Sequence, residues 1–400
     1  MSQVERDIQQ VKDVTLLRRM ADVLDVDLGE LMALPQPAAA RVSSRPRRGA
    51  SDTLTSTSVA EEDDMRRRQV MTVATAALFA QSVGPQSAHA GSAPLAELED
   101  LLLYGTSRAL PSTHPTHQTV ASSLKASRQE FRTARYDVLA RALPTRIATA
   151  QAVGTVEESA GAVAQLYNLA VRLCIKIGDN NLVAITADRA LTAARLSGDP
   201  LIIAEAQRMV SSAWRRQERF ARATDIVVVA AEELLADSGV PEADRLATRG
   251  DLYATAAYTA AKSGDRAYAH SLIDEAADSA AAAGRTSGQD DGVAGVALHW
   301  LSVHYELGDA GRAIALARTI DPAALPTPER RARFFTDVAR AFDRWGKPES
   351  CFKALLAAEK AAPQEIQRGV VRDLASGLLR HDRTLGGVRA FAGRAGARFD

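Results

Sequence analysis

The sequence lacks several features that are typical of large classes of protein: many cysteines, an excess of basic residues and long apolar runs. Its 400 residues include only two cysteines, Cys174 and Cys351, too few for a disulfide framework and without the spacing of a metal site. Positive and negative side chains balance at 49 each, which excludes a globally basic nucleic-acid binder but leaves room for a local basic face. No apolar run reaches the roughly 18 residues of a membrane span. We therefore expect no membrane partner, and the cysteine usage suits a cytoplasmic protein.

What the chain does contain favours helices. Apolar residues make up 46% of it, aromatic residues only 5%, and alanine is abundant throughout. The prediction is an all-α protein in three parts. Residues 1–34 have a helical pattern, residues 35–94 form a linker with an arginine-headed apolar helix, and residues 95–400 are alanine-rich helix after helix.

The first part carries a resemblance. The segment SQVERDIQQVKDVTLLRRMADVLDVDLGELM is similar to the second half of a Cro/lambda-repressor-type helix-turn-helix domain, of the xenobiotic-response-element class found in actinobacterial regulators. Ser2, Val4, Glu5 and Arg6 match the end of that family's recognition helix, although Asp7 replaces its usual glycine. The resemblance implies a DNA-binding transcriptional regulator, with Ser2, Gln3 and Arg6 as what remains of the DNA contacts.

The family's earlier helices, which include most of the groove-reading helix, would lie upstream of Met1. Either the gene start lies further upstream or the domain is degenerate. Residues 1–34 carry four basic and seven acidic side chains, which gain little from phosphate contacts. We therefore expect DNA to be a partner only if an upstream extension completes the domain.

Residues 65–90 allow two interpretations. Arg66–Arg68, the apolar stretch Val70–Ala80 and the ending Ala88-His89-Ala90 resemble a twin-arginine export signal, which would make an exported helical protein starting at Met65. Actinobacterial regulators of the resembled class carry a similar helix between their two domains. We favour this linker helix because helix-turn-helix sequence precedes it.

The long third part repeats itself. Turns at Gly178-Asp179, Glu218-Arg219, Gly264-Asp265, Gly308-Asp309 and Gly346-Lys347 lie 40, 46, 44 and 38 residues apart. Small or apolar residues recur five, nine and twelve positions after each turn, as two closely packed antiparallel helices require. Upstream, the pattern of residues 131–147 predicts one helix that ends near Pro144.

These units resemble tetratricopeptide repeats, with Tyr167, Tyr253 and Phe335 at the first aromatic place of that motif. The intervals exceed the usual 34 residues, and HEAT-like helix pairs remain an alternative. The resemblance implies an α-solenoid whose first helices line a concave surface.

Positions ten, six and two residues before each turn would face that surface. Most are arginine, lysine, asparagine or tyrosine, and only Glu306 is acidic. Guanidinium, ammonium and amide groups suit a peptide carboxylate or backbone. The predicted ligand groove therefore comprises Asn168, Arg172, Lys176, Arg208, Arg216, Tyr258, Lys262 and Arg340.

Catalytic patterns are scarce. The sequence has no GxSxG, GxxxxGK or HExxH motif, and His114 and His117 flank a proline without nearby thiols or carboxylates. We expect no enzyme, no cofactor and no metal. The leading interpretation is a cytoplasmic, homodimeric regulator whose repeats sense a peptide or protein ligand. The alternatives are a scaffold for protein–protein interaction that does not bind DNA, and the exported protein described above.

Overall fold

A computed structural model describes residues 95–105, 115–287 and 291–397. All of them fall within one of the chain's two compact units, Gln86–Asp400. The remnant residues Ser2, Gln3 and Arg6, the linker, the arginine-headed stretch and His114 lie outside the described residues. No helix of the described residues combines the length and apolar character of a membrane span.

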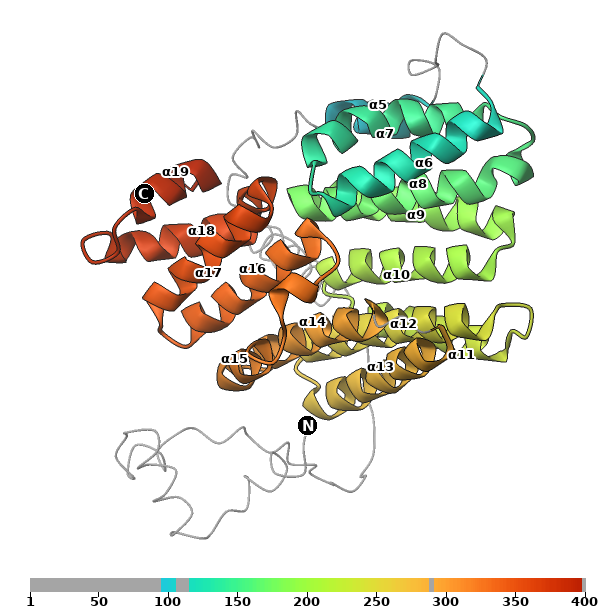
Figure 1. The fold of residues 1–400 in the computed structure, drawn as a ribbon. Helices are drawn as coiled ribbons and strands as arrows, with labels where there is room; N and C mark the ends of the chain where they lie inside the picture. Colours follow the sequence, from blue (N-terminus) through green and yellow to red (C-terminus); the bar gives the residue numbers. More distant parts are fainter. Residues whose placement is uncertain (1–94, 106–114, 288–290, 398–400) are drawn as a thin grey trace, which may run out of the picture. The chain divides into compact units, whose positions relative to one another are not determined.

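The described part of the chain is all-α and contains no strand, as the composition predicts. Its helices follow one another in antiparallel order (Figure 1). Their bounds are α5 Ala96–Tyr104, α6 His117–Arg132, α7 Tyr136–Gln151, α8 Val156–Ile177, α9 Asn180–Ser197, α10 Pro200–Arg216, α11 Phe220–Ala236, α12 Glu242–Lys262, α13 Arg266–Ser287, α14 Asp291–Glu306, α15 Ala310–Ala317, η4 Pro322–Ala324, α16 Pro328–Arg344, α17 Pro348–Ala361, η5 Pro363–Gln367, α18 Gly369–Leu378, η6 Leu379–His381 and α19 Val388–Ala395.

All five predicted turns separate two helices, and each contains a left-handed residue. Gly178, Gly264, Gly308 and Gly346 have φ values from 68° to 94°. Glu218 adopts the same conformation, with φ of 59°, although it has a Cβ. Each predicted turn therefore lies between the two helices of a pair, and these pairs are α8–α9, α10–α11, α12–α13, α14–α15 and α16–α17.

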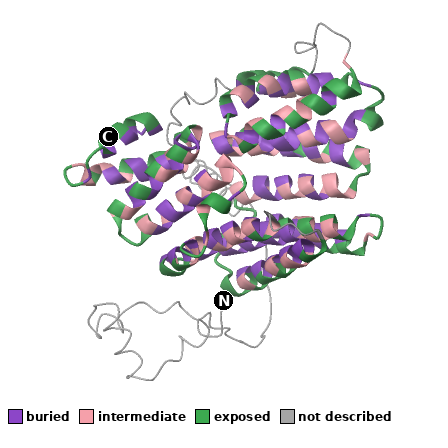
Figure 2. Ribbon diagram, viewed as in Figure 1, coloured by how far each residue is buried: buried purple, intermediate pink, exposed green. Residues whose placement is uncertain are grey.

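The predicted packing positions five residues after each turn are also confirmed. The residues five positions after the turns are all fully buried: Val183, Ala223, Ala269, Ala313 and Cys351. Figure 2 shows such buried positions as stripes along the helices, beside exposed ones. Small side chains at these places let the two helices of a pair approach closely.

The expectation for residues 131–147 is wrong. Helix α6 ends at Arg132, Ala134 turns the chain with φ of 55°, and α7 continues through Pro144 to Gln151. Proline inside a helix removes one backbone hydrogen bond. Helix α7 tolerates this loss because Leu139, Leu143 and Ile147 are fully buried on its packed face.

Segments far apart in the chain meet in the described unit, because α16 and η5 contact α7 and α8. Ala332 of α16 and Ala362 belong to the same hydrophobic core as helices α5 to α10. Gln364 Oε1 accepts a hydrogen bond of 2.7 Å from the backbone N–H of Tyr136. Helices far apart in sequence thus share one core. As a result, residues of α16 and η5 lie next to Lys176, one of the predicted groove residues.

Candidate ligand-binding site

Helix α8 supplies three of the predicted groove residues on one face, because Asn168, Arg172 and Lys176 are four positions apart. Thr155 and Glu158 cap the start of this helix reciprocally, and Gly178 ends it in a left-handed conformation. The three side chains have different surroundings. Asn168 has no partner, Arg172 pairs with a carboxylate of α10, and Lys176 is buried among acidic groups.

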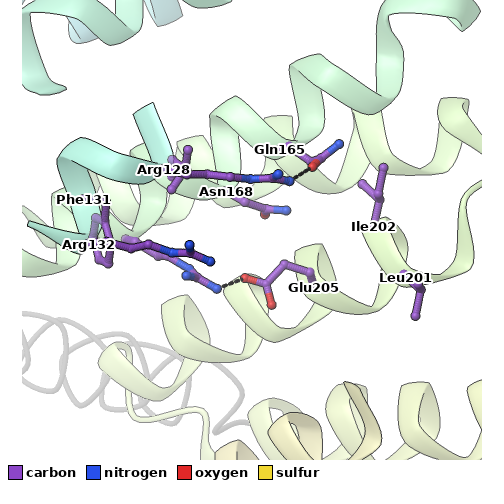
Figure 3. A pocket seen from close by; sticks show the side chains of 10 residues that line it. Arg128, Phe131, Arg132, Gln165, Asn168, Leu201, Ile202 and Glu205 are labelled. Carbon is purple, nitrogen blue, oxygen red and sulfur yellow. Dashed lines mark hydrogen bonds and ion pairs between the residues drawn. The ribbon is translucent and has the colours of Figure 1, made fainter. Parts of the chain in front are cut away.

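A pocket lies beside Asn168 and Arg172, between helices α6, α8 and α10. Its volume is about 290 Å³. Figure 3 shows the Asn168 amide between the Arg128–Gln165 pair on one side and Glu205, Arg132 and a neighbouring guanidinium on the other. The lining residues are Arg128, Phe131, Arg132, Gln165, Asn168, Leu169, Arg172, Leu201, Ile202 and Glu205.

Positive charge exceeds negative charge around this pocket. Arg172 Nη2 lies 2.5 Å from Glu205 Oε1. Burial and the charges of Arg132 and Arg172 lower the pKa of Arg128, whose guanidinium donates only to the neutral amide oxygen of Gln165. Three arginines thus line the pocket with a single carboxylate, an arrangement that favours an anionic ligand group.

The carboxylate of Glu205 forms ion pairs with two arginines of the protein itself, Arg172 and Arg208. Burial alone would raise its pKa, but Arg172 and Arg208 lower the pKa to about 2. Arg208 holds it bidentately through bonds of 2.8 and 2.9 Å. Glu205 therefore stays ionised and holds the Arg172 side chain at the edge of the pocket.

Asn168 is the least satisfied residue of the site. Its side chain is 4% exposed, and neither Nδ2 nor Oδ1 has a hydrogen-bond partner. A buried amide without partners costs roughly 1–3 kcal/mol for each unmade bond. One donor and one acceptor on the pocket wall match a peptide group, which offers one acceptor and one donor.

Lys176, in contrast, is part of a buried cluster of charges. Its Nζ lies 2.5 Å from Glu329 Oε1 and 2.6 Å from Glu365 Oε1. Burial and the charge of Glu365 raise the pKa of Tyr136, whose hydroxyl donates to that carboxylate. Arg368 reaches Glu365 at 3.1 Å. We name this the Lys176 cluster; its members are Tyr136, Lys176, Glu329, Glu365 and Arg368.

The structure pairs most of the other predicted groove residues internally. Arg340 lies 2.9 Å from Glu306 and 3.3 Å from Asp337. Tyr258 Oη donates to the same Glu306 at 3.0 Å. Arg216 reaches only the carbonyl of Ser212, at 3.4 Å. Lys262 is exposed at the end of α12 and lines no part of the pocket.

Several pocket residues were not among the sequence candidates. Arg128 and Arg132 lie on α6, outside the repeat register that selected the groove, and Glu205 lies on α10 one turn before the first selected position, Arg208. Spacing of four residues on an amphipathic helix was the only sequence signal for the two arginines. Their approach to Asn168 depends on how α6 packs against α8.

The two cysteine thiols are not in a reactive state, and the described residues hold no candidate metal site. The Cys174 and Cys351 thiols are buried, and burial raises the pKa of each to about 12. Thiols in this state are poor nucleophiles. Within residues 95–105, 115–287 and 291–397, no group of histidine, cysteine and acidic side chains is arranged to hold a metal ion.

Comparison with protein-family models and with curated protein sequences gives no match. Among solved structures, the chain is similar to BtubC (BKLC) from P. vanneervenii. The identity is 16%, the match covers 61% of this chain and 89% of the other, and the TM-score is 0.33.

Proposed function

We propose that this chain is a DNA-binding transcriptional regulator whose tetratricopeptide-like repeats sense a peptide or protein ligand. The helix-turn-helix resemblance of residues 1–34 supports the DNA-binding half of the proposal. The observation that carries the sensing half is the buried, unpartnered amide of Asn168 in a pocket lined by three arginines.

The pocket suits one end of a peptide rather than a long segment. Its volume of about 290 Å³ is near the lower end of ligand pockets. The Asn168 amide would hold one peptide group of the ligand. Arg128 and Arg132 would hold a carboxylate, and Leu169, Leu201 and Ile202 would contact an apolar side chain.

A peptide bound there would contact α6, α8 and α10 together. Such a ligand stabilises whichever arrangement of the three helices fits it best, and shifts the population toward that arrangement. In a homodimer, the shift would change the spacing of the two DNA-binding halves.

The sensing half is tested with a pool of random tetrapeptides that carry a free carboxyl end. The pool is equilibrated with the purified full chain, and retained peptides are identified by mass spectrometry. We expect a defined subset to be retained by the wild type and by Thr186→Val, which changes a buried hydroxyl outside the pocket. Asn168→Leu should lose that subset. Equal retention by all three proteins, or no retained subset, would refute a peptide site at Asn168.

The DNA-binding half is tested by gel shift on the gene's own promoter region. This chain is compared with one extended upstream in the same frame, each with and without a retained peptide. A shift that responds to the peptide supports the regulator. If neither protein shifts the DNA while peptide binding persists, the scaffold alternative is favoured.

A further inference from the structure

The Asn168 pocket holds two of its arginines in different ways. Arg172 of α8 forms an ion pair with Glu205, with 2.5 Å between Nη2 and Oε1. Arg128 of α6 instead donates from Nη2 to Oε1 of Gln165, a neutral amide. Figure 3 shows the two contacts on opposite sides of the Asn168 side chain. One guanidinium of the pocket is therefore balanced by a carboxylate, and the other is held by a neutral group.

The amide of Gln165 has a fixed orientation. Gln165 lies three positions before Asn168, so both side chains leave the same face of α8. Its Nε2 donates to the carbonyl oxygen of Gly161 at 3.1 Å, while its Oε1 accepts from Arg128. Turning the amide over would set an NH2 group against a guanidinium and an oxygen against a carbonyl, and both contacts would be repulsive. Gln165 therefore presents an acceptor to Arg128.

Gln165 positions Arg128 but leaves its charge unbalanced. Among the residues that line the pocket, Glu205 is the one acidic side chain, and it is already paired with Arg172. Burial and the charges of Arg132 and Arg172 lower the pKa of Arg128, as expected for a cation whose charged neighbours are also cations. Arg128 still has an exposed part, and Gln165 accepts from one of the five N–H donors of its guanidinium. The remaining donors can reach a ligand in the pocket.

We propose that Gln165 gives the Asn168 pocket its preference for a peptide with a free carboxyl end over one that is amidated or continues as a longer chain. The inference rests on the peptide function proposed above and names the feature of the ligand that the pocket selects. A free carboxylate supplies the negative charge that Arg128 lacks and can accept two parallel bonds from a guanidinium. An amide offers one oxygen without net charge, so it neither balances Arg128 nor accepts in this bidentate way.

The selectivity depends on the neutral side chain of Gln165. Gln165→Glu would keep the size and reach of that side chain, but it would form an ion pair with Arg128 like the one between Glu205 and Arg172. Arg128 would then have no unbalanced charge, and the added carboxylate would repel the carboxylate of the ligand. Gln165 acts through Arg128, so it is a positioning residue.

The test uses two pools of the same random tetrapeptides, one with free carboxyl ends and one with amidated ends. Each pool is equilibrated with the purified full chain, and a retained sequence is then made in both forms for calorimetry. We expect the free-carboxyl form to bind the wild type roughly ten- to hundredfold more tightly than its amide, the range for a hydrogen bond between charged groups. Thermal unfolding without peptide shows whether each variant is folded.

Gln165→Glu should remove most of this difference. It should weaken binding of the free-carboxyl form at least tenfold and change the affinity for the amide by less than about threefold, whereas loss of a residue that only supports the fold would affect both forms alike. The matched control is Gln129→Glu, which makes the same change one position after Arg128, at an exposed residue that does not line the pocket. The control should keep the ratio of the two affinities within about twofold of the wild type.

Arg128→Gln gives a second, independent variant if Gln165→Glu does not fold. It removes the charge that Gln165 leaves available, so it should lower the ratio of affinities to the same extent. Two results would overturn the role of Gln165 while leaving a peptide site at Asn168 intact: equal binding of both forms by the wild type, or an unchanged ratio in the folded variants. Failure of the wild type to retain any tetrapeptide would instead refute the proposed peptide site, and this inference with it.

Discussion

Lys176 and Glu365 are 189 positions apart in the chain, yet Nζ of the lysine lies 2.6 Å from Oε1 of the glutamate. Lys176 is 8% exposed and Glu365 is fully buried. Glu329 contacts the same ammonium, so one lysine joins α8 to both α16 and η5. This pairing connects α8 to two segments that follow Lys176 by 153 and 189 positions.

Replacing Lys176 with methionine should destabilise the protein strongly. The change leaves Glu365 and Glu329 close together without their shared cation, and breaking a buried pair in this way costs about 3–5 kcal/mol. The free energy of unfolding is measured by denaturant titration. Lys262→Met, at an exposed lysine, is the control and should lie within about 0.5 kcal/mol of the wild type. Similar values for both variants would show that the Lys176 cluster contributes little.

The same cluster predicts loss of stability in acid. Burial would raise the pKa of Glu365, but Lys176 and Arg368 lower it to about 2, below its ordinary value of 4.5. A carboxyl with a depressed pKa contributes stability above its unfolded pKa and loses that contribution as the pH falls. The free energy of unfolding should therefore decrease between pH about 5 and about 2. Glu365→Gln should be less stable at pH 7 and show a shallower decrease, and an unchanged slope would contradict this assignment.

Asn168→Leu should not destabilise the ligand-free protein. The substitution removes a buried amide without partners, so the free energy of unfolding should stay constant or rise by up to about 1–3 kcal/mol. The matched control is Ser302→Ala, because that buried hydroxyl has bonds of 3.0 Å to Leu298 and Asp337. This control should lose about 1 kcal/mol. A loss of the same size in Asn168→Leu would mean that the amide stabilises the fold.

The turn residues predict a reciprocal pair of substitutions. Glu218 holds a left-handed backbone that costs about 1–2 kcal/mol for a residue with a Cβ, so Glu218→Gly should raise the free energy of unfolding by about 1 kcal/mol. Gly264 has a φ of 83° with open space around it, so Gly264→Ala should lower stability by about the same amount. Thermal unfolding of both variants checks the prediction, and changes of equal sign would contradict it.

Much of the fold could be predicted because the repeat signal is local. The turns at Gly178 and Gly264 and the small residues that follow them depend only on residues nearby in sequence. Pro144 misled the prediction because its local preference is outweighed by burial of the packed face of α7.

The site was harder to predict because its partners come from distant helices. Nothing near Lys176 in sequence indicates Glu329 or Glu365, and nothing near Arg172 indicates Glu205. The repeat register selected basic residues on α8, α10, α12 and α16, but which of them pair with carboxylates depends on how successive helix pairs stack. That the buried amide of Asn168 lacks partners becomes apparent only when those ion pairs are known.

The contact between Lys176 and Glu365 also affects how the protein is made. At 5–20 residues per second, translation separates the two residues by about ten to forty seconds. During that interval Lys176 lacks its carboxylates, and the apolar core beside it lacks Ala332 and Ala362. The nascent chain therefore exposes apolar surface and an unpaired lysine, which a holdase chaperone can bind. A chain whose translation stops before Glu365 keeps this surface exposed.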